Sequence, residues 1–324
     1  MKALRVAVAG VGQMGLRHAE KVAALGASGL GVELAGVADV DAGRAADVAA
    51  RLGTRGVTDP DALLAEIDAL VIAVPTVHHH AVATRALAAG VDVLVEKPIA
   101  TSLAQAEELV AQARAGGRIL QVGHQEWFNA AMGAVRGSVE APRFAEIHRM
   151  GPFPDRSGDV DVVLDLMIHD IEILQGLLGS EPDRVEAVGV PVLTDLVDIA
   201  NARLCFGTRC VANLTASRVS VSAMRRFRLF QRDAYVSIDF LEQKSVIFRR
   251  RPGATGQPPE IDVDEFKGER EDTLLAQLEV FLQAVRRRKF DGKVGPAVTG
   301  AAATSALRTA LRVIDAMPPL DEAP

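Results

Sequence analysis

The chain has 324 residues, of which 49% are hydrophobic and 24% are charged, and its formal net charge is −6 at pH 7. This length allows two medium domains, because single hydrophobic cores stop growing at about 250–300 residues. The acidic balance argues against nucleic acid or an anionic membrane as the main partner. It leaves open a small anionic ligand, which needs only a local basic patch.

No apolar run approaches the roughly 20 residues that span a bilayer, and no secretory signal precedes the first expected strand. We therefore expect a reduced chain in the cytoplasm. Its two cysteines, Cys205 and Cys210, flank a turn at Gly207-Thr208 and could face each other across a hairpin. A cytoplasmic setting favours free buried thiols over a cross-strand disulfide.

The first 123 residues alternate short apolar runs with helical stretches, which is typical of a doubly wound α/β (Rossmann) domain. One helix begins at Asp59-Pro60, and another is capped by Thr101 or Ser102 and ends at Gly116-Gly117. The expected strands are apolar on both faces, as in a parallel sheet covered by helices. They are Leu4–Ala9, Leu34–Ala38, Ala69–Val74, Val91–Val95 and Ile119–Val122.

After Gly123 the pattern changes to segments that alternate polar with apolar residues, which predicts an α+β domain with an open, mostly antiparallel sheet. Expected loops cover Gly151–Asp161 and Arg251–Pro259. The expected helices are Asn129–Val135, Val163–Leu178, Asp272–Arg287 and Gly300–Ala316. The expected strands are Ala145–Met150, Arg184–Val192, Ile199–Phe206, Arg209–Ser217, Phe227–Gln231, Ala234–Phe240 and Ser245–Arg249.

We therefore predict a cofactor-binding domain over residues 1–123. Residues 124–324 are expected to form a domain for substrate binding and oligomerisation, with the last helix able to pack back on the first domain.

The run Gly10-Val11-Gly12-Gln13-Met14-Gly15 follows the first expected strand and opens a helix, which is the context that a G-x-G-x-x-G motif requires. Gly10 makes the tight turn, Gly12 lets the backbone approach a pyrophosphate, and Gly15 permits close helix–strand packing. The helix start, at Gln13 and Met14, offers N–H groups to the phosphates. A glycine-rich turn without a ligand is the alternative, but the flanking strand and helix favour a dinucleotide.

Asp39 stands at the end of the second expected strand. A carboxylate there accepts hydrogen bonds from the adenosine ribose and repels a 2′-phosphate, which favours NAD over NADP. Arg44 lies close by in the sequence, so NADP remains the alternative.

The segment Val93–Ala100, which contains Glu96-Lys97-Pro98, resembles the signature of the glucose-fructose oxidoreductase/inositol dehydrogenase family (Gfo/Idh/MocA). The glycine motif and three further stretches match that family: Pro75-Thr76 with His79, Gly123–Asn129, and Asp165–Asp170. The resemblance implies a Rossmann domain followed by an open mixed sheet that often serves oligomerisation. It also implies that Pro75, Thr76, His79, Glu96 and Lys97 line the cofactor site.

The resemblance further implies catalytic roles for three residues. Lys97 would lie beside the nicotinamide and the reacting hydroxyl, His169 would be the general base or acid, and Asp165 would accompany it. This agrees with the chemistry, because alcohol oxidation needs a base for the hydroxyl proton and benefits from a cation near the oxygen. Asp165 and His169 are four residues apart and so share one face of a helix.

Other interpretations of these residues stay open. Lys97 could be a surface lysine at a strand end, and Asp165 with His169 could be a helix salt bridge or, with Glu172, a metal-binding face. The run His78-His79-His80 also invites a metal, but adjacent helical residues diverge by about 100°. We expect no metal site, and we place His79 near the cofactor.

The segment Gly123–Ala130 departs from its family at two positions. Relatives that act on sugar nucleotides often read Gly-His-x-Glu-Arg-Phe-Asn-Pro here, whereas this chain has Trp127 for the arginine and Ala130 for the proline. The contact that the arginine would make is therefore not carried over. The expected substrate contacts are His124, Trp127, Phe128, Asn129, Asp165, His169 and Arg218.

Two segments, Val162–Ile171 and Ala212–Ser220, resemble the UDP-N-acetylglucosamine 3-dehydrogenases of lipid A biosynthesis. This implies NAD-dependent oxidation of the sugar 3-hydroxyl to a 3-keto sugar, followed by a pyridoxal-phosphate aminotransferase. A diphosphate needs paired cations, for which Arg218, Arg225 and Arg226 are candidates. Alternatively, these arginines form a solvated strand face or a subunit contact.

Two other functions compete with this one: a dehydrogenase of a free sugar or inositol, and a non-catalytic sugar or cofactor sensor on the same fold. Retention of Lys97, Asp165 and His169 speaks against the sensor. We expect a homo-oligomer, because the outward face of the second sheet would otherwise be exposed.

Overall fold

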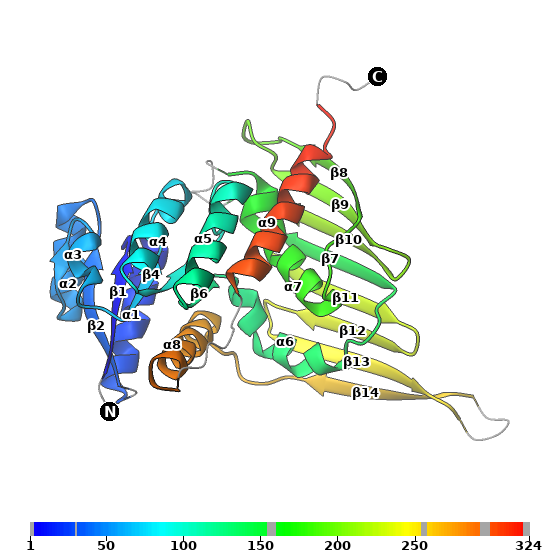
Figure 1. The fold of residues 1–324 in the computed structure, drawn as a ribbon. Coiled ribbons are helices and arrows are strands. Elements are labelled where there is room, and N and C mark those ends of the chain that lie inside the picture. The colour runs from blue at the N-terminus through cyan, green and yellow to red at the C-terminus, as the bar shows by residue number, and fades with distance from the viewer. Residues whose placement is uncertain (1–2, 30, 154–159, 254–257, 292–298, 320–324) are drawn as a thin grey trace. The chain divides into compact units, whose positions relative to one another are not determined.

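The computed structural model describes residues 3–29, 31–153, 160–253, 258–291 and 299–319 (Figure 1). The chain divides into two compact units. The first comprises Met1–His124 and Leu274–Thr304, and the second comprises Gln125–Thr273 and Ser305–Pro324. Parts of the two predicted loops, residues 154–159 and 254–257, lie outside the described residues.

A six-stranded parallel sheet forms the centre of the first unit, with the strand order β3-β2-β1-β4-β5-β6. This is the order of a Rossmann fold and confirms the predicted doubly wound domain. The strands are β1 (Leu4–Ala9), β2 (Val32–Ala38), β3 (Gly56–Val57), β4 (Ala69–Ile72), β5 (Asp92–Val95) and β6 (Leu120–Val122). The helices are α1 (Gln13–Ala27), α2 (Ala42–Leu52), α3 (Asp61–Leu64), α4 (His79–Ala88) and α5 (Leu103–Ala115).

A helix from late in the chain completes the core of this unit. Helix α8 (Thr273–Asp291) contributes Leu278, Phe281 and Val285, which are fully buried with Val6 of β1. The sheet is apolar on both faces because helices cover it on both faces.

The second unit contains an eight-stranded sheet with the order β14-β13-β12-β11-β7-β10-β9-β8. Only the pair of β7 with β10 is parallel among these neighbours, which confirms the predicted mostly antiparallel sheet. The strands are β7 (Phe144–Met150), β8 (Arg184–Val190), β9 (Ile199–Phe206), β10 (Cys210–Ser217), β11 (Met224–Gln231), β12 (Ala234–Asp239), β13 (Lys244–Arg251) and β14 (Glu260–Phe266).

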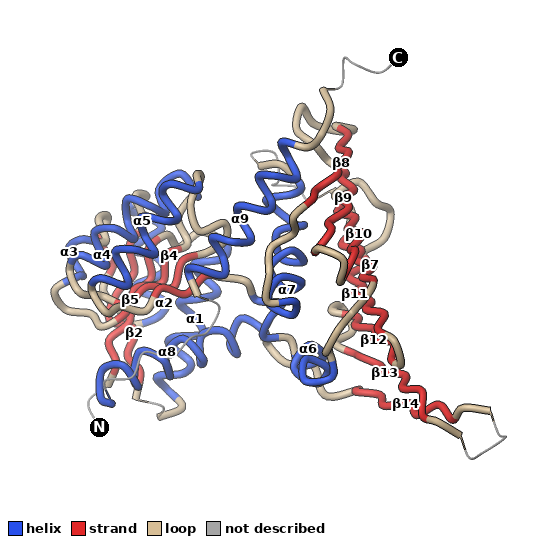
Figure 2. Tube along the Cα trace, turned by 45° about the vertical axis from the view of Figure 1, so that its right-hand side comes forward, coloured by secondary structure: helices blue, strands red, loops and turns tan. Residues whose placement is uncertain are grey.

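Three helices lie along one face of this sheet: α6 (Ala130–Val135), α7 (Ile168–Leu178) and α9 (Gly300–Asp315), as Figure 2 shows. A π-helical turn over Val163–Met167 leads into α7. The buried side chains of Gln175 and Thr309 join α7 to α9 by a 2.6 Å hydrogen bond. Along β7 the side chains alternate between buried and half-buried, because one face packs on the helices and no described helix covers the other.

Both cysteines are free thiols, as the sequence predicted. In the β9–β10 hairpin Cys205 pairs with Val211, while Cys210 pairs with Phe206. The two thiols therefore project from opposite faces of the sheet, which excludes a disulfide between them. Among the described residues, no helix is both long and apolar enough to cross a bilayer.

Candidate active site

The glycine loop between β1 and α1 has the shape that a dinucleotide fold requires. Gly10 has a φ of +80°, and a Cβ built on it would lie 2.7 Å from the backbone of Ala73 and Val74. A Cβ on Gly15 would lie 1.7 Å from the carbonyl oxygen of Gly10. Both glycines are therefore needed for the packing of the loop itself.

Gly12 is different, because a Cβ there would meet no described atom within 4 Å. It is the N-cap of α1, and among the described side chains none caps this helix end. The first turn, which includes the predicted Gln13 and Met14, contains no acidic residue. Free N–H groups and open space above Gly12 fit a phosphate group, as bound NAD would supply.

This contrast predicts that Gly12→Ala weakens NAD binding by tenfold or more without unfolding the protein. The new methyl group would occupy only space that the ligand needs. Calorimetric titration with NAD and a thermal melt measure the two effects separately. Gly15→Ala is the comparison variant, since its Cβ clashes with the loop and should lower the melting temperature as well. Unchanged NAD binding in Gly12→Ala would contradict the placement of the phosphates.

Asp39 is buried directly after β2 and accepts a hydrogen bond from the backbone of the glycine loop. Its carboxylate accepts hydrogen bonds from the backbone N–H of Val11 at 2.9 Å and of Asp41 at 3.0 Å. The Arg44 guanidinium donates to both carboxylate oxygens at 3.2 Å. Arg44 is thus engaged by the acid that repels a 2′-phosphate, which supports NAD rather than NADP.

The turn after β5 carries Glu96, Lys97 and Pro98, with a cis peptide bond between Lys97 and Pro98. His18 of α1 donates from Nε2 to the Glu96 carboxylate at 2.7 Å. A Cβ on Gly123 would lie only 2.8 Å from that carboxylate, so this position has no room for a side chain. Although burial opposes it, the His18 hydrogen bond and the charge of Lys97 lower the pKa of Glu96. Glu96 is therefore an ionised carboxylate next to Lys97 in the chain.

The His79 side chain joins two turns of the first unit. Its ring is 1% exposed, with Nδ1 2.9 Å from the Pro98 carbonyl oxygen and Nε2 2.9 Å from the Val74 carbonyl oxygen. Burial lowers the pKa of His79. The ring therefore joins the turn after β4 to the turn that holds Lys97, and its predicted place beside the cofactor stays a prediction.

The neighbouring histidines of His79 face other surroundings. His78 is exposed, whereas His80 lies 2.9 Å from the carboxylate of Glu108. Over the described part of the chain, no three His, Cys, Asp or Glu side chains gather as metal ligands. Pro75 and Thr76 border this turn, and their cofactor contacts stay predictions.

His124 follows β6 and is buried. Burial, followed by the nearby charge of Lys97, lowers its pKa to about 3. The imidazole is therefore neutral over the physiological range and can serve a substrate as a hydrogen-bonding group but not as a cation. Its predicted contact with substrate stays a prediction.

In the second unit the predicted residues lie along one stripe of the helix that leads into and forms α7. Asp165, His169, Glu172 and Gly176 are spaced i, i+4, i+7 and i+11. The ring of Trp127 packs on Gly176, where an added Cβ would lie 2.9 Å from the indole. This packing brings the segment with Trp127 and Phe128 onto the helix face that carries Asp165 and His169. The meeting of these residues with Lys97 stays a prediction.

Glu172 belongs to the same stripe, and its side chain has an unusual environment. The residue is 4% exposed, and its Oε2 atom has no hydrogen-bond partner among the described residues. Burial raises the pKa of Glu172 to about 8. The side chain is therefore a neutral carboxylic acid at pH 7, one helical turn from His169.

Protonation of Glu172 predicts a pH-dependent stability. The folded protein keeps a proton that the unfolded chain releases above its ordinary pKa of 4.5. The free energy of unfolding should therefore fall as the pH rises from about 4.5 to about 8, by at most about 1.4 kcal/mol per pH unit. Urea unfolding across this range should show that fall in the native protein and a smaller one in Glu172→Gln, which stays neutral. Equal pH slopes in the two proteins would refute the assignment.

A buried ion network that the sequence did not reveal joins the two segments of this unit that resemble the family, Gly123–Asn129 and Asp165–Asp170. Arg149 of β7 donates Nε and Nη2 to Asp170 at 2.9 and 2.8 Å, and Nη1 to Glu126 at 2.9 Å. Asp170 follows His169, and Glu126 precedes Trp127. The only sequence signal is an arginine at an inward position of an alternating strand.

Asn129 has a structural role at the start of α6. Its side chain caps α6 by accepting from Ala131 N–H at 3.1 Å and donates to the Phe240 carbonyl oxygen at 3.2 Å. Both ends of the buried amide are thus used within the unit, and the expected substrate contact of Asn129 stays a prediction.

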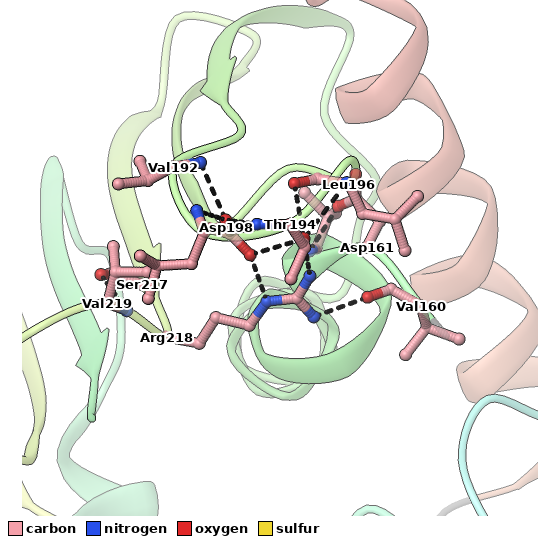
Figure 3. Close-up of polar contacts among 11 residues, drawn as sticks. Val160, Asp161, Val192, Thr194, Leu196, Asp198, Ser217, Arg218 and Val219 are labelled. Atoms are coloured by element: carbon pink, nitrogen blue, oxygen red, sulfur yellow. Dashed lines mark hydrogen bonds and ion pairs between the residues drawn. The ribbon is translucent and has the colours of Figure 1, made fainter. Parts of the chain in front are cut away.

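Arg218 lies within a buried polar network of the second unit (Figure 3). It is 1% exposed, and its guanidinium donates to Asp198 at 2.8 Å, to the Val160 carbonyl oxygen at 2.7 Å and to the Thr194 hydroxyl at 3.1 Å. Asp198 in turn accepts from three backbone N–H groups of the loop between β8 and β9. All three guanidinium nitrogens are engaged within the unit, and the predicted substrate contact of Arg218 stays a prediction.

Comparison with known proteins agrees with this architecture. Residues 4–124 match the GFO/IDH/MocA oxidoreductase family with its NAD-binding Rossmann fold, and residues 132–236 match the C-terminal domain of that family. The chain is 41% identical over 303 residues to UDP-N-acetylglucosamine 3-dehydrogenase of Acidithiobacillus ferrooxidans, which covers 92% of this chain and 95% of that enzyme. The chain belongs to the Gfo/Idh/MocA family. The resemblance seen around Glu96-Lys97-Pro98 is thereby confirmed.

Two further similarities complete the comparison. A solved structure of the Acidithiobacillus ferrooxidans enzyme matches with a TM-score of 0.88 and 39% identity, covering 98% of both chains. Inositol 2-dehydrogenase of Mycolicibacterium smegmatis is 32% identical over 191 residues, 56% of this chain and 54% of that enzyme. As a member of the Gfo/Idh/MocA family, the chain is an oxidoreductase with NAD as its cofactor.

Proposed function

We propose that this oxidoreductase oxidises the 3-hydroxyl of UDP-N-acetylglucosamine to the 3-keto sugar. The observation that carries the proposal is the 41% identity over 303 residues to an enzyme of that name, in a chain that retains Lys97, Asp165 and His169. The match covers 92% of the chain and therefore extends over both units.

The retained residues suit the loss of a hydride and a proton from a secondary alcohol. Bound NAD supplies the acceptor for the hydride. Lys97, backed by the Glu96 carboxylate, places a positive charge where the hydroxyl oxygen binds. His169 accepts the hydroxyl proton as the general base, and Asp165 on the same helix face orients it. The C–H and O–H bonds of the alcohol break, and a carbonyl forms.

One alternative has a specific observation in its favour. Similarity to an inositol 2-dehydrogenase extends over 56% of the chain, which keeps a free polyol or sugar as a candidate substrate. A sensor without activity has no such support, because the three residues of the proposed chemistry are present.

The test is a comparison of substrates with the purified protein and NAD. NADH formation is followed with UDP-N-acetylglucosamine, free N-acetylglucosamine and myo-inositol in parallel. A glutamate-dependent aminotransferase is coupled to remove the ketone, because an unfavourable equilibrium would hide turnover. Turnover of the nucleotide sugar alone is expected. Turnover of inositol alone would replace the proposed substrate, and NAD binding without any turnover would favour the sensor.

The same proposal extends to the cellular setting. A 3-keto sugar is the substrate class of pyridoxal-phosphate aminotransferases, so such an enzyme is the expected next partner. NAD and nucleotide sugars are cytoplasmic metabolites, and the two free thiols suit that compartment.

We also propose that the sheet of the second unit forms a homo-oligomer through its open face. An aromatic row crosses four neighbouring strands there, with ring centroids 5.6 Å apart for Phe144 and Phe230, 4.9 Å for Phe230 and Tyr235, and 5.8 Å for Tyr235 and Phe248. Phe230 and Phe248 are partly exposed in a single chain. Such an apolar row, with no described helix over it, is typical of a surface that another copy covers.

Phe230→Glu is therefore expected to shift the protein toward monomers. The new carboxylates would repel each other and leave the apolar row without a complementary partner. Light scattering coupled to size exclusion measures the mass, and Val221→Glu at a fully exposed loop position is the control. A native protein that is already monomeric would refute the oligomer.

A further inference from the structure

We infer that Arg225 is the residue that binds the diphosphate of the substrate. The inference rests on the proposed function, since it assumes a nucleotide sugar. It assigns one specificity-determining cation among the three arginines, Arg218, Arg225 and Arg226, that the sequence places near one another.

The strand register separates Arg225 from Arg226. In β11, Arg225 pairs with Arg149 of β7, and both project toward the helix-covered face of the sheet. Arg226 pairs with His148, so it projects toward the opposite face, where it donates to Asp239 at 3.0 Å. Arg218 is buried and fully engaged, so of these three arginines Arg225 is the one on the helix side with an exposed guanidinium.

Arg225 is connected to the catalytic helix by two shared contacts. Its Nη1 donates to Glu126 Oε1 at 2.9 Å, and the same oxygen accepts from Arg149 at 2.9 Å. Arg149 in turn holds Asp170, the residue after His169. These links place Arg225 close to the start of α7 and beside the segment that carries Trp127.

The guanidinium of Arg225 retains donors for a ligand. Its side chain is 44% exposed, and only Nη1 has a hydrogen-bond partner among the described residues. Glu126 fixes its position, which lowers the entropy that a phosphate contact would otherwise cost. A guanidinium held in this way matches a phosphate through two parallel N–H donors.

The proposed substrate carries its diphosphate close to the hydroxyl that reacts. In UDP-N-acetylglucosamine the diphosphate is attached to C1, and one ring carbon separates C1 from the reacting C3. The phosphates must therefore lie near the residues that act on the 3-hydroxyl. Arg225 is adjacent to that helix start, whereas a free sugar would make no use of its charge.

The experiment compares Arg225→Gln with Arg226→Gln in the full-length protein. Calorimetric titration with UDP measures binding without chemistry, and a titration with NAD and a thermal melt serve as controls of fold. UDP should bind at least tenfold more weakly to Arg225→Gln and equally well to Arg226→Gln. KM for UDP-N-acetylglucosamine should rise by a similar factor in Arg225→Gln, whereas a purely structural role would lower NAD binding and the melting temperature as well.

Three outcomes overturn the inference, and they separate its failure from that of the proposed function. If native protein and Arg225→Gln bind UDP equally and turn over the nucleotide sugar equally, Arg225 is not the diphosphate ligand although the proposed function stands. If both variants lose UDP binding to the same extent, the effect is general charge and not a site. If the native protein neither binds UDP nor oxidises the nucleotide sugar, the proposed function fails and the inference fails with it.

Discussion

Lys97→Ala is expected to lower kcat by about 10²- to 10⁴-fold, the range that a positioned acid–base group contributes. The variant removes the cation that we propose at the reacting oxygen but leaves the glycine loop and Asp39 unchanged. Binding of NAD should therefore stay within a few-fold of the native value. Initial rates with the coupled assay and a calorimetric NAD titration measure the two quantities, and Lys244→Ala, at an exposed strand end, is the control.

A double variant tests whether Lys97 and His169 act on the same hydroxyl. Lys97 belongs to the first unit, and His169 belongs to the second. If both act on one hydroxyl, the double variant Lys97→Ala/His169→Gln should be no slower than the slower single variant, since residues that act as a unit are not additive. Multiplicative losses, or a native rate in Lys97→Ala, would contradict a shared reaction centre.

The sequence predicted the fold class and most strands because local hydrophobic patterns determine them. Continuous apolar runs mark buried parallel strands, and the predicted strand Leu4–Ala9 has the bounds of β1. Alternation along Ile199–Phe206 likewise gave the bounds of β9. The sequence did not predict two strands, β3 and β14, and each omission has a physical reason. The strand β3 has only two residues, and β14 carries four acids among seven residues at an exposed sheet edge, where no apolar pattern is needed.

The candidate site was predictable where backbone geometry limits the residue type. Only glycine fits at Gly10 and Gly15, so the glycine motif in the sequence predicted this loop. For side chains such as His79, Asn129 and Arg218, a sequence shows polarity but not the direction in which the side chain points. Each proved to have its partners within the fold.

The buried network of Arg149, Glu126 and Asp170 could not be predicted from the sequence either. Its members come from separate segments: Glu126 precedes Arg149 by 23 residues, and Asp170 follows Arg149 by 21. No local pattern links such positions, because the pairing exists only after β7 and α7 have packed together. The residues of this network were therefore absent from the prediction, although their neighbours in sequence were included.

Arg149→Met is expected to destabilise the protein by about 3–5 kcal/mol, which is typical when one partner of a buried ion pair is removed. Asp170 and Glu126 would stay buried without the guanidinium that both accept from. Burial already raises the pKa of Asp170 in the presence of Arg149. Urea unfolding followed by circular dichroism measures the loss, and Arg203→Met, at an exposed position of β9, should change stability by less than about 0.5 kcal/mol.

The triple variant Arg149→Met/Glu126→Gln/Asp170→Asn separates buried charge from lost packing. It removes the uncompensated carboxylates and should recover part of the stability that Arg149→Met loses. The single variant should also be less unstable in acid, because protonation of Asp170 in the folded state removes its buried charge and binds a proton that the unfolded chain does not. Its deficit relative to the native protein should therefore grow as the pH rises. If the triple variant recovers nothing and the deficit is independent of pH, Arg149 stabilises this unit by packing alone, and the network does not position His169 through charge.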